Sequence, residues 1–236
     1  MAMKTNIKIK WLGHSAVQLV SPGGKIILID PFLSQNPSTP ENEKKQEKAD
    51  FILLTHGHED HVGDTLEIAK NTGAKVVSMV ELSGLLKQDG LAEDQAVEMN
   101  KGGTLDLGEF TVTMTNANHS SSFGGRYAGE PAGLMIAFKD DITVYHAGDT
   151  NIMPDFELYA HLYDPEVVFL PIGDYYTMGV MEASLAAEML GSAYFIPIHY
   201  GTFPVLTGSP EEFKKVVETE SDSKVVIAKA GEWVKL

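Results

Sequence analysis

The stretch FILLTHGHEDHVGD, residues 51–64, constrains the fold and chemistry of this chain more than any other. Its four leading apolar residues read as a buried strand that stops at Thr55. Candidate metal ligands then fall within six positions, and they are His56, His58, Asp60 and His61. Imidazole nitrogen and carboxylate oxygen suit Zn²⁺ and other first-row divalent ions. A strand that delivers these groups at its end predicts a metal site.

An amphipathic helix follows at once, because apolar residues continue at helical spacing from Val62 to Ala69. The first two imidazoles can then point in one direction while Asp60 and His61 point in another, as two adjacent metal ions require. A single His-x-His pair is more often a surface or core feature than a metal site. Four candidate ligands in six positions at a strand end favour the metal interpretation.

Further motifs give the chain a resemblance to a known family. HGHEDH, residues 56–61, matches the HxHxDH motif of the metallo-β-lactamase superfamily. Matching motifs follow in the expected order, namely NANHSSS with His119, YHAGDT with Asp149 and IPIHYGTF with His199. With WLGHSAVQL and LPIGDYYTMG, the pattern resembles the UPF0173 group of metal-dependent hydrolases over nearly the whole chain. These motifs are specific for the superfamily and much less so for a substrate.

The resemblance implies a cofactor of two divalent metal ions. The implied ligands are His56, His58 and His119 for one ion, and Asp60, His61 and His199 for the other. Asp149 is implied as the bridge, since a carboxylate has two oxygens and can bind two cations. Zinc is expected first, with manganese, iron, nickel or cobalt as alternatives, because His and carboxylate sites accept all of them.

Three other residues are candidates for contact with the substrate or with the ligands. The resemblance puts His14 near the site, although a simple turn histidine is an equal interpretation. Asp30 matches a superfamily aspartate that supports the ligand loops, and such carboxylates hold imidazoles in one tautomer. Asp174, in GDYYTMG, either supports a ligand beside pocket-forming Tyr and Met residues or caps a turn. Residues 200–203 are expected as further pocket wall.

Arg126 is the only arginine of the chain and lies seven positions beyond His119, in a Gly- and Ser-rich loop. A guanidinium group suits phosphate or carboxylate. We therefore formulate the hypothesis that Arg126 binds an anionic group of the substrate, with a solvent-exposed loop arginine as the alternative.

Composition limits the partners. The net charge of −15 disfavours binding to nucleic acid and to anionic membranes. The chain has no cysteine, which excludes disulfides and a thiol nucleophile. The start lacks the apolar segment of a signal peptide, and no stretch approaches a membrane span, so a cytoplasmic protein is expected. The expected partner is a small-molecule substrate, and self-association stays open.

The apolar pattern predicts a mixed α/β (α+β) fold in two similar halves, within one domain over residues 1–236. Strands are predicted at 7–12, 16–20, 25–29, 51–54, 74–79, 95–99, 103–107, 110–115, 134–138, 142–146, 167–171, 194–198 and 224–228, with a last one ending at 236. Helices are predicted at 81–88, 154–162, 181–190 and 210–218. Residues 34–50 are expected to form a solvated loop with a short helix. The four-layer αββα sandwich, two sheets flanked by helices, is implied by the resemblance.

The implied activity is that of a metal-dependent hydrolase. A metal pair lowers the pKa of bound water from about 16 towards about 7 and supplies a metal-bridging hydroxide. Asp60 and Asp149 are the candidate catalytic carboxylates, Asp60 because it lies beside the nucleophile. A lactone or ester of a small anionic metabolite is the expected substrate, and a phosphodiester is the runner-up. A di-iron redox site or a metal-binding module without turnover are the alternatives from other classes.

Overall fold

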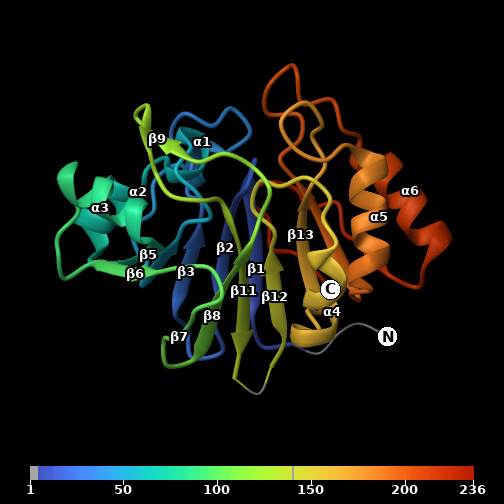
Figure 1. Cartoon of the computed structure of the whole chain (residues 1–236), viewed down its shortest axis with the longest axis horizontal. Helices are drawn as coiled ribbons and strands as arrows, with labels where there is room; N and C mark the ends of the chain where they lie inside the picture. The colour runs from blue at the N-terminus through green and yellow to red at the C-terminus, as the bar shows by residue number, and fades with distance from the viewer. Residues whose placement is uncertain (1–4, 140) are drawn as a thin grey trace.

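The apolar strands of the first half of the chain form one six-stranded sheet. Figure 1 shows the computed structural model, in which residues 5–139 and 141–236 are described. The strands lie in chain order and are β1 (Lys8–Gly13), β2 (Ala16–Val20), β3 (Ile26–Ile29), β4 (Phe51–Leu53), β5 (Lys75–Met79) and β6 (Ala96–Met99). The first three strands pair antiparallel, and β3 to β6 pair parallel.

The second half forms a seven-stranded sheet with the same mixture of pairings. Its order is β15 (Lys224–Val225), β14 (Tyr194–Ile198), β13 (Val167–Pro171), β12 (Thr143–His146), β11 (Ala132–Phe138), β8 (Phe110–Asn116) and β7 (Thr104–Asp106). Strands β7, β8, β11 and β12 pair antiparallel, and β12 to β15 pair parallel. A short hairpin of β9 (Ser122–Phe123) and β10 (Arg126–Tyr127) stands apart from both sheets.

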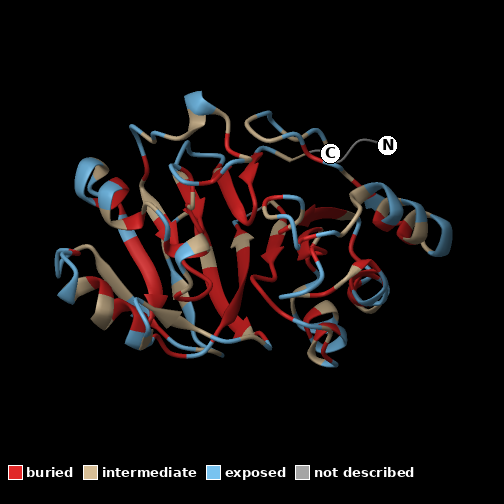
Figure 2. Cartoon of the chain, turned by 90° about the horizontal axis from the view of Figure 1, so that it is seen from above, coloured by how far each residue is buried: buried red, intermediate tan, exposed pale blue. Residues whose placement is uncertain are grey.

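Three layers of apolar side chains hold the two sheets and the helices together. The central layer joins the facing sides of the sheets, for example Leu19 and Val77 with Val112 and Phe169. The outer layers join each sheet to its helices. These helices are α2 (Thr65–Thr72) and α3 (Val80–Gln88) on the first sheet, and α4 (Asp155–Tyr163), α5 (Val180–Leu190) and α6 (Pro210–Glu220) on the second. The fold is therefore the predicted αββα sandwich, and Figure 2 shows the buried residues concentrated in the strands.

The predicted elements agree with the structure except in four places. The helix predicted from Val62 to Ala69 is broken at Gly63, which has a φ of 42°, into α1 (Glu59–Val62) and α2. The loop that follows His119 contains the hairpin β9–β10, which the sequence did not indicate. The strand predicted at 224–228 is only two residues long, and the closing strand is reduced to a single bridge between Lys10 and Trp233. This tail runs antiparallel beside the edge strand β1 instead of extending the second sheet. Asp140, at the tip of the predicted β11–β12 hairpin, lies outside the described residues.

The candidate ligands all follow the carboxyl ends of strands. His56 follows β4, His119 follows β8, Asp149 follows β12 and His199 follows β14. Parallel strands end at one edge of a sheet, so these loops meet at one end of the sandwich, the upper end in Figure 1, where the short helix α1 (Glu59–Val62) lies. The loop at 34–50 carries one 3-10 turn, Glu41–Glu43, as predicted.

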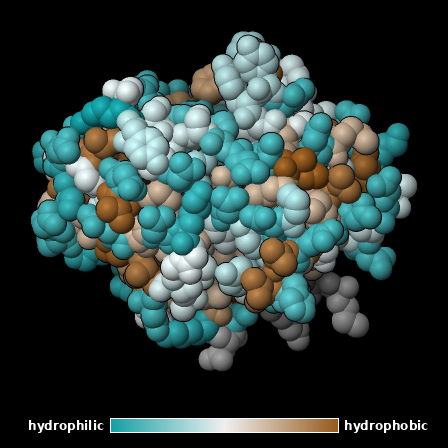
Figure 3. All heavy atoms as spheres, viewed as in Figure 1, coloured by the Kyte–Doolittle hydropathy of each residue, from teal (hydrophilic) through white to brown (hydrophobic). Residues whose placement is uncertain are grey.

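The surface is mostly hydrophilic on the face shown in Figure 3, with hydrophobic side chains in scattered spots. Several large apolar side chains are exposed on α4 and α5, namely Leu158, Leu162, Met181 and Leu185. Self-association stays a prediction. Across the described part of the chain, every helix is too short or too polar to cross a bilayer.

Candidate metal centre

Three histidines form the first ligand group. His56 and His58 follow β4, and His119 arrives from the loop after β8. The Nε2 atom of His56 lies 2.9 Å from Nδ1 of His58. The ring of His119 lies 5.3 Å from that of His56 and 5.1 Å from that of His58, centroid to centroid. One nitrogen from each ring lies within 4.8 Å of the others, so one cation can reach all three.

The second ligand group brings Asp60 and His61 of α1 to His199, which follows β14. The Nε2 atom of His199 lies 4.0 Å from Oδ2 of Asp60. His199 adopts a φ of 56°, a strained backbone conformation for a residue other than glycine. Its backbone N–H donates to the carbonyl of His14 at 3.0 Å, which holds this conformation in place.

Asp149 lies between the two groups. Its Oδ2 atom is 3.5 Å from Nε2 of His119 and 3.1 Å from Nε2 of His199, and its Oδ1 atom is 3.3 Å from Nε2 of His61. Burial alone would raise the pKa of Asp149, but the charges of His199 and His61 outweigh it and hold that pKa well below its ordinary value. Asp149 is therefore an ionised carboxylate that contacts histidines from both groups.

The chemistry of these side chains fits two divalent cations. Within the described part of the chain, the buried Nε2 atoms of His61 and His199 and the Oδ1 atom of Asp149 have no hydrogen-bond partner. Buried polar atoms without partners are costly and rare, and a metal ion would satisfy all three. Burial, with the neighbouring His61, also holds the pKa of His56 well below its ordinary value, so its imidazole is neutral and able to bind a cation.

Asp30 orients a histidine from each group. Its Oδ2 atom accepts the Nδ1–H of His61 at 2.7 Å and the hydroxyl of Thr55 at 2.6 Å. Thr55 Oγ1 in turn lies 3.0 Å from Nδ1 of His56, and the Thr55 backbone N–H donates to Asp30 Oδ1 at 2.9 Å. The Nδ1 atoms of His56 and His61 are thereby occupied, which leaves both Nε2 atoms free for metal. The sequence pointed to Asp30 as a supporting residue, whereas Thr55, the residue before His56, was not recognised.

Asp30→Asn is expected to weaken metal binding by about 10- to 100-fold, because the amide cannot accept both donors while holding the imidazole tautomers. Competition against a chromophoric chelator measures the effect. Asp50→Asn is a matched control, since Asp50 also accepts a strand N–H, that of Ile26, but it precedes β4, whereas the ligands follow that strand, and it pairs with Lys25. Unchanged affinity in Asp30→Asn would show that the tautomers are fixed by other contacts.

His14 is buried against the second ligand group. Its Nε2 atom lies 3.1 Å from Oδ2 of Asp60 and its Nδ1 atom lies 3.0 Å from Oγ1 of Thr202. Burial, with the charge of His199, lowers the pKa of His14 to about 4, so this imidazole is neutral near pH 7. Of the two interpretations open from the sequence, the structure supports a contact with a ligand. His14 Nε2 also belongs to the group of atoms that could hold a cation with Asp60, His61 and His199.

Arg126 is not brought to the ligands. Its guanidinium pairs with the Asp89 carboxylate at 2.6 Å and donates to Gln88 at 3.4 Å, on the side of α3. The hypothesis that Arg126 binds an anionic substrate group is therefore not supported. Asp174 is exposed and accepts the backbone N–H of Tyr175 at 2.7 Å, with both residues at positive φ. The turn interpretation is the one that the structure supports for Asp174, which contacts no ligand.

The metal-free protein should bind cations more weakly as the pH falls. Burial lowers the pKa of His61, but Asp149 and Asp30 outweigh burial and raise it well above its ordinary value. A bound cation must displace this proton, so affinity rises with pH as His61 loses it. Calorimetry in two buffers of different ionisation enthalpy should show release of about one proton per chain near neutral pH, and less in Asp30→Asn. Affinity that does not change with pH would contradict this assignment.

The ligands face a cavity of about 440 Å³. Its lining combines ligand residues with a partly apolar wall and consists of His58, Asp60, His119, Ser120, Asp149, Tyr176, His199, Phe203 and Val205. Tyr176 and Phe203 belong to segments expected from the sequence to form pocket wall. Ser120 directly follows a candidate ligand, in the hydroxyl-rich loop that was expected to face the substrate, whereas Val205 was not recognised. Ser120 Oγ lies 3.4 Å from Nε2 of His58.

Comparison with known proteins places this geometry in a family. The model of the beta-lactamase superfamily domain matches residues 25–200. A UPF0173 metal-dependent hydrolase of Koribacter versatilis is 47% identical over 216 residues, which cover 90% of this chain and 92% of the relative. Another, from Rubrobacter xylanophilus, is 44% identical over 231 residues and 95% of each chain. Igni18, a metallo hydrolase from the archaeon Ignicoccus hospitalis, has a solved structure with a TM-score of 0.88 and 38% identity, covering 98% of each chain.

These relatives cover the whole region that carries the seven candidate ligands. The chain belongs to the metallo-β-lactamase superfamily and, within it, to the UPF0173 metal-dependent hydrolases.

Proposed function

We propose that this protein is a dinuclear metal-dependent hydrolase that opens a lactone or ester. The observation that carries the proposal is the position of Asp149, which contacts histidines of both ligand groups at the edge of the 440 Å³ cavity. One ion would be held by His56, His58 and His119, and the other by Asp60, His61 and His199. When bound, two divalent ions would supply hydroxide near neutral pH and polarise the carbonyl oxygen.

The side chains divide the remaining work. Hydrolysis of the ester C–O bond by one water would give an alcohol and a carboxylate, and one proton would have to leave the site. Burial alone would raise the pKa of Asp60, but the hydrogen bond from His14 and the charge of His61 outweigh it and lower that pKa. Asp60 therefore stays ionised, lines the cavity, and is placed to position the nucleophile or accept its proton.

The cavity supports a small-molecule substrate but not its expected negative charge. The anionic group depended on Arg126, which pairs with Asp89 instead. Among the described residues, no lysine or arginine lines the 440 Å³ cavity or a second cavity of about 590 Å³ that also borders Asp60. The bond to be cleaved stays as expected from the resemblance, with a lactone or ester ahead of a phosphodiester.

The test begins with metal content, on protein purified without a metal-affinity tag. Lactone, ester, phosphodiester and amide panels are then assayed before and after chelation. About two ions per chain, with an ester or lactone activity that chelation removes and one added ion restores, are expected. His119→Ala should lose that activity, whereas His161→Ala is the matched control, because His161 is exposed on α4.

Two results would overturn the proposal in different ways. If only the phosphodiester is hydrolysed, the metal centre is retained in the proposal and the cleaved bond is a phosphodiester instead of an ester. If added metal neither binds to the protein nor restores hydrolysis of any substrate in the panels, the proposal of a hydrolase is wrong.

A further inference from the structure

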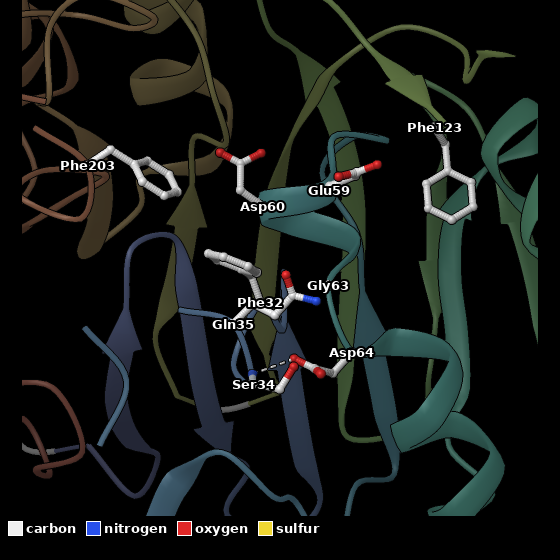
Figure 4. Close-up of a pocket in the computed structure, with 9 residues that line it drawn as sticks. All are labelled: Phe32, Ser34, Gln35, Glu59, Asp60, Gly63, Asp64, Phe123 and Phe203. Atoms are coloured by element: carbon white, nitrogen blue, oxygen red, sulfur yellow. Dashed lines mark hydrogen bonds between the residues drawn. The ribbon is translucent and has the colours of Figure 1, made fainter. Parts of the chain in front are cut away.

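A second hollow adjoins the metal-lined cavity. It has a volume of about 590 Å³ and shares Asp60 and Phe203 with the first cavity, so the two cavities are adjacent. Figure 4 shows Phe203 on one side and Phe123 on the other, with Asp60 and Glu59 between them and Phe32 below. We call this hollow the phenylalanine trough. A substrate whose reacting bond lies at the metal centre would extend its remaining part into the trough.

The charged groups that line the trough are all carboxylates, and they are Glu59, Asp60 and Asp64. The Asp64 carboxylate already accepts the backbone N–H groups of Leu33 and Ser34, each at 2.8 Å. Asp60 is hydrogen-bonded to His14 and is a proposed metal ligand. The Glu59 carboxylate has no hydrogen bond or ion pair with any side chain or backbone group that the structure describes, and it is exposed to solvent.

Positive charge near the trough is already balanced or absent. Arg126 lies 5.7 Å from the Phe123 ring centroid, but its guanidinium is paired with Asp89. His14, which packs edge-on against Phe32 and Phe203 at 6.0 and 5.5 Å between ring centroids, is buried. Aromatic faces attract cations, and an unpaired carboxylate adds to this attraction. An anionic group placed beside Glu59 would meet no lysine or arginine among the residues that line the trough.

We propose that the phenylalanine trough binds the positively charged end of the substrate, an ammonium or quaternary ammonium group, against Glu59 and the rings of Phe32 and Phe203. This inference rests on the proposed hydrolase function, because it assigns the substrate class of the same site. It reverses the sign of the charge that the sequence suggested. The group that recognises the substrate is then Glu59 on α1, one residue before a candidate metal ligand.

The test compares three short-chain esters of similar size on the metal-loaded protein. Butyrylcholine is cationic, 3,3-dimethylbutyl butyrate is its uncharged isostere, and 3-carboxypropyl butyrate is anionic. We expect kcat/KM for the choline ester to exceed that for the isostere on the order of tenfold, and the anionic ester to be the poorest. The preference should fall as salt is added, because Glu59 is exposed.

Two variants and one control assign the preference to the trough. Glu59→Gln should bring the ratio between the choline ester and its isostere close to one. Phe32→Leu keeps apolar volume but removes an aromatic face, and should lower the same ratio; Phe32 does not line the metal cavity. Glu157→Gln removes the same charge from an exposed position on α4 and should leave the ratio unchanged.

A binding measurement separates this inference from the proposed function. Tetramethylammonium is titrated into the metal-loaded protein and followed by nuclear magnetic resonance, with 3,3-dimethylbutanol for comparison. If no ester is hydrolysed but the cation binds and depends on Glu59, the trough assignment holds and the esterase function fails. If esters are hydrolysed with the isostere or the anion preferred, the function holds and the trough assignment is wrong. The trough assignment is also wrong if tetramethylammonium does not bind and the choline ester is not preferred over its uncharged isostere.

Discussion

Asp149→Asn is expected to lower kcat/KM for the substrate of this hydrolase by about 1,000-fold or more and to reduce the metal content from about two ions per chain to about one. The carboxylate contacts His61 and His199 from one ligand group and His119 from the other. An amide has one oxygen and no charge, so it cannot bind two cations. Without the negative charge of the carboxylate between them, the two cations would repel each other.

Elemental analysis and steady-state kinetics on the same preparation measure both effects. Asp164→Asn is the matched control, because Asp164 is exposed at the end of α4 in a left-handed conformation that asparagine also adopts readily. Two ions retained with full activity in Asp149→Asn would mean that this carboxylate does not bridge the metals.

Gly173→Ala is expected to destabilise the protein by about 3 kcal/mol and to weaken the ion held by His199. Gly173 directly follows Ile172, whose backbone N–H donates to the carbonyl of Ile198 where β13 and β14 end side by side. A Cβ atom at Gly173 would overlap the carbonyl oxygen of His199. Backbone must move to relieve the overlap, and the backbone that moves carries a candidate ligand.

Chemical unfolding of the metal-free protein and metal titration test this prediction separately. Gly84→Ala provides the opposite expectation, because Gly84 lies within α3 with open space around its Cα and an ordinary helical conformation. That variant should be more stable by about 0.5–1 kcal/mol, since alanine loses less entropy than glycine in a helix. Equal stability of Gly173→Ala and the parent would show that the two strand ends are loosely packed.

Four of the seven candidate ligands could be found from one local stretch of sequence. His56, His58, Asp60 and His61 are adjacent along the chain, and a strand followed by a helix orients them without any long-range information. His119, Asp149 and His199 follow strands from distant parts of the chain, and periodicity does not say which strands end side by side. Their assignment depended on the family resemblance. The positions of strands and helices followed from apolar spacing, whereas the division into two sheets did not.

Arg126 and Asp174 differ from what the resemblance favoured for different reasons. Arg126 pairs with Asp89, at the end of α3 in a different part of the chain, so its loop position said nothing about where its charge would go. Asp174 begins a pair of residues at positive φ, and that backbone conformation makes its carboxylate accept the next N–H. The phenylalanine trough draws its three rings from three separate segments of the chain, and only Phe203 was in a segment expected to form pocket wall.

Each proposed ion takes ligands from both halves of the chain, which has a mechanical consequence. A chain without cysteine cannot form a disulfide cross-link. The two ions would instead act as non-covalent cross-links between the His56–His61 segment, which follows a strand of the first sheet, and the ligand loops of the second sheet. Closing loops of this length restricts the unfolded chain, and binding only to the folded state raises stability with the logarithm of ion concentration. Chelation should therefore loosen the seam between the sheets at this end first, and hydrogen exchange would show faster opening there than at the opposite end of the sandwich.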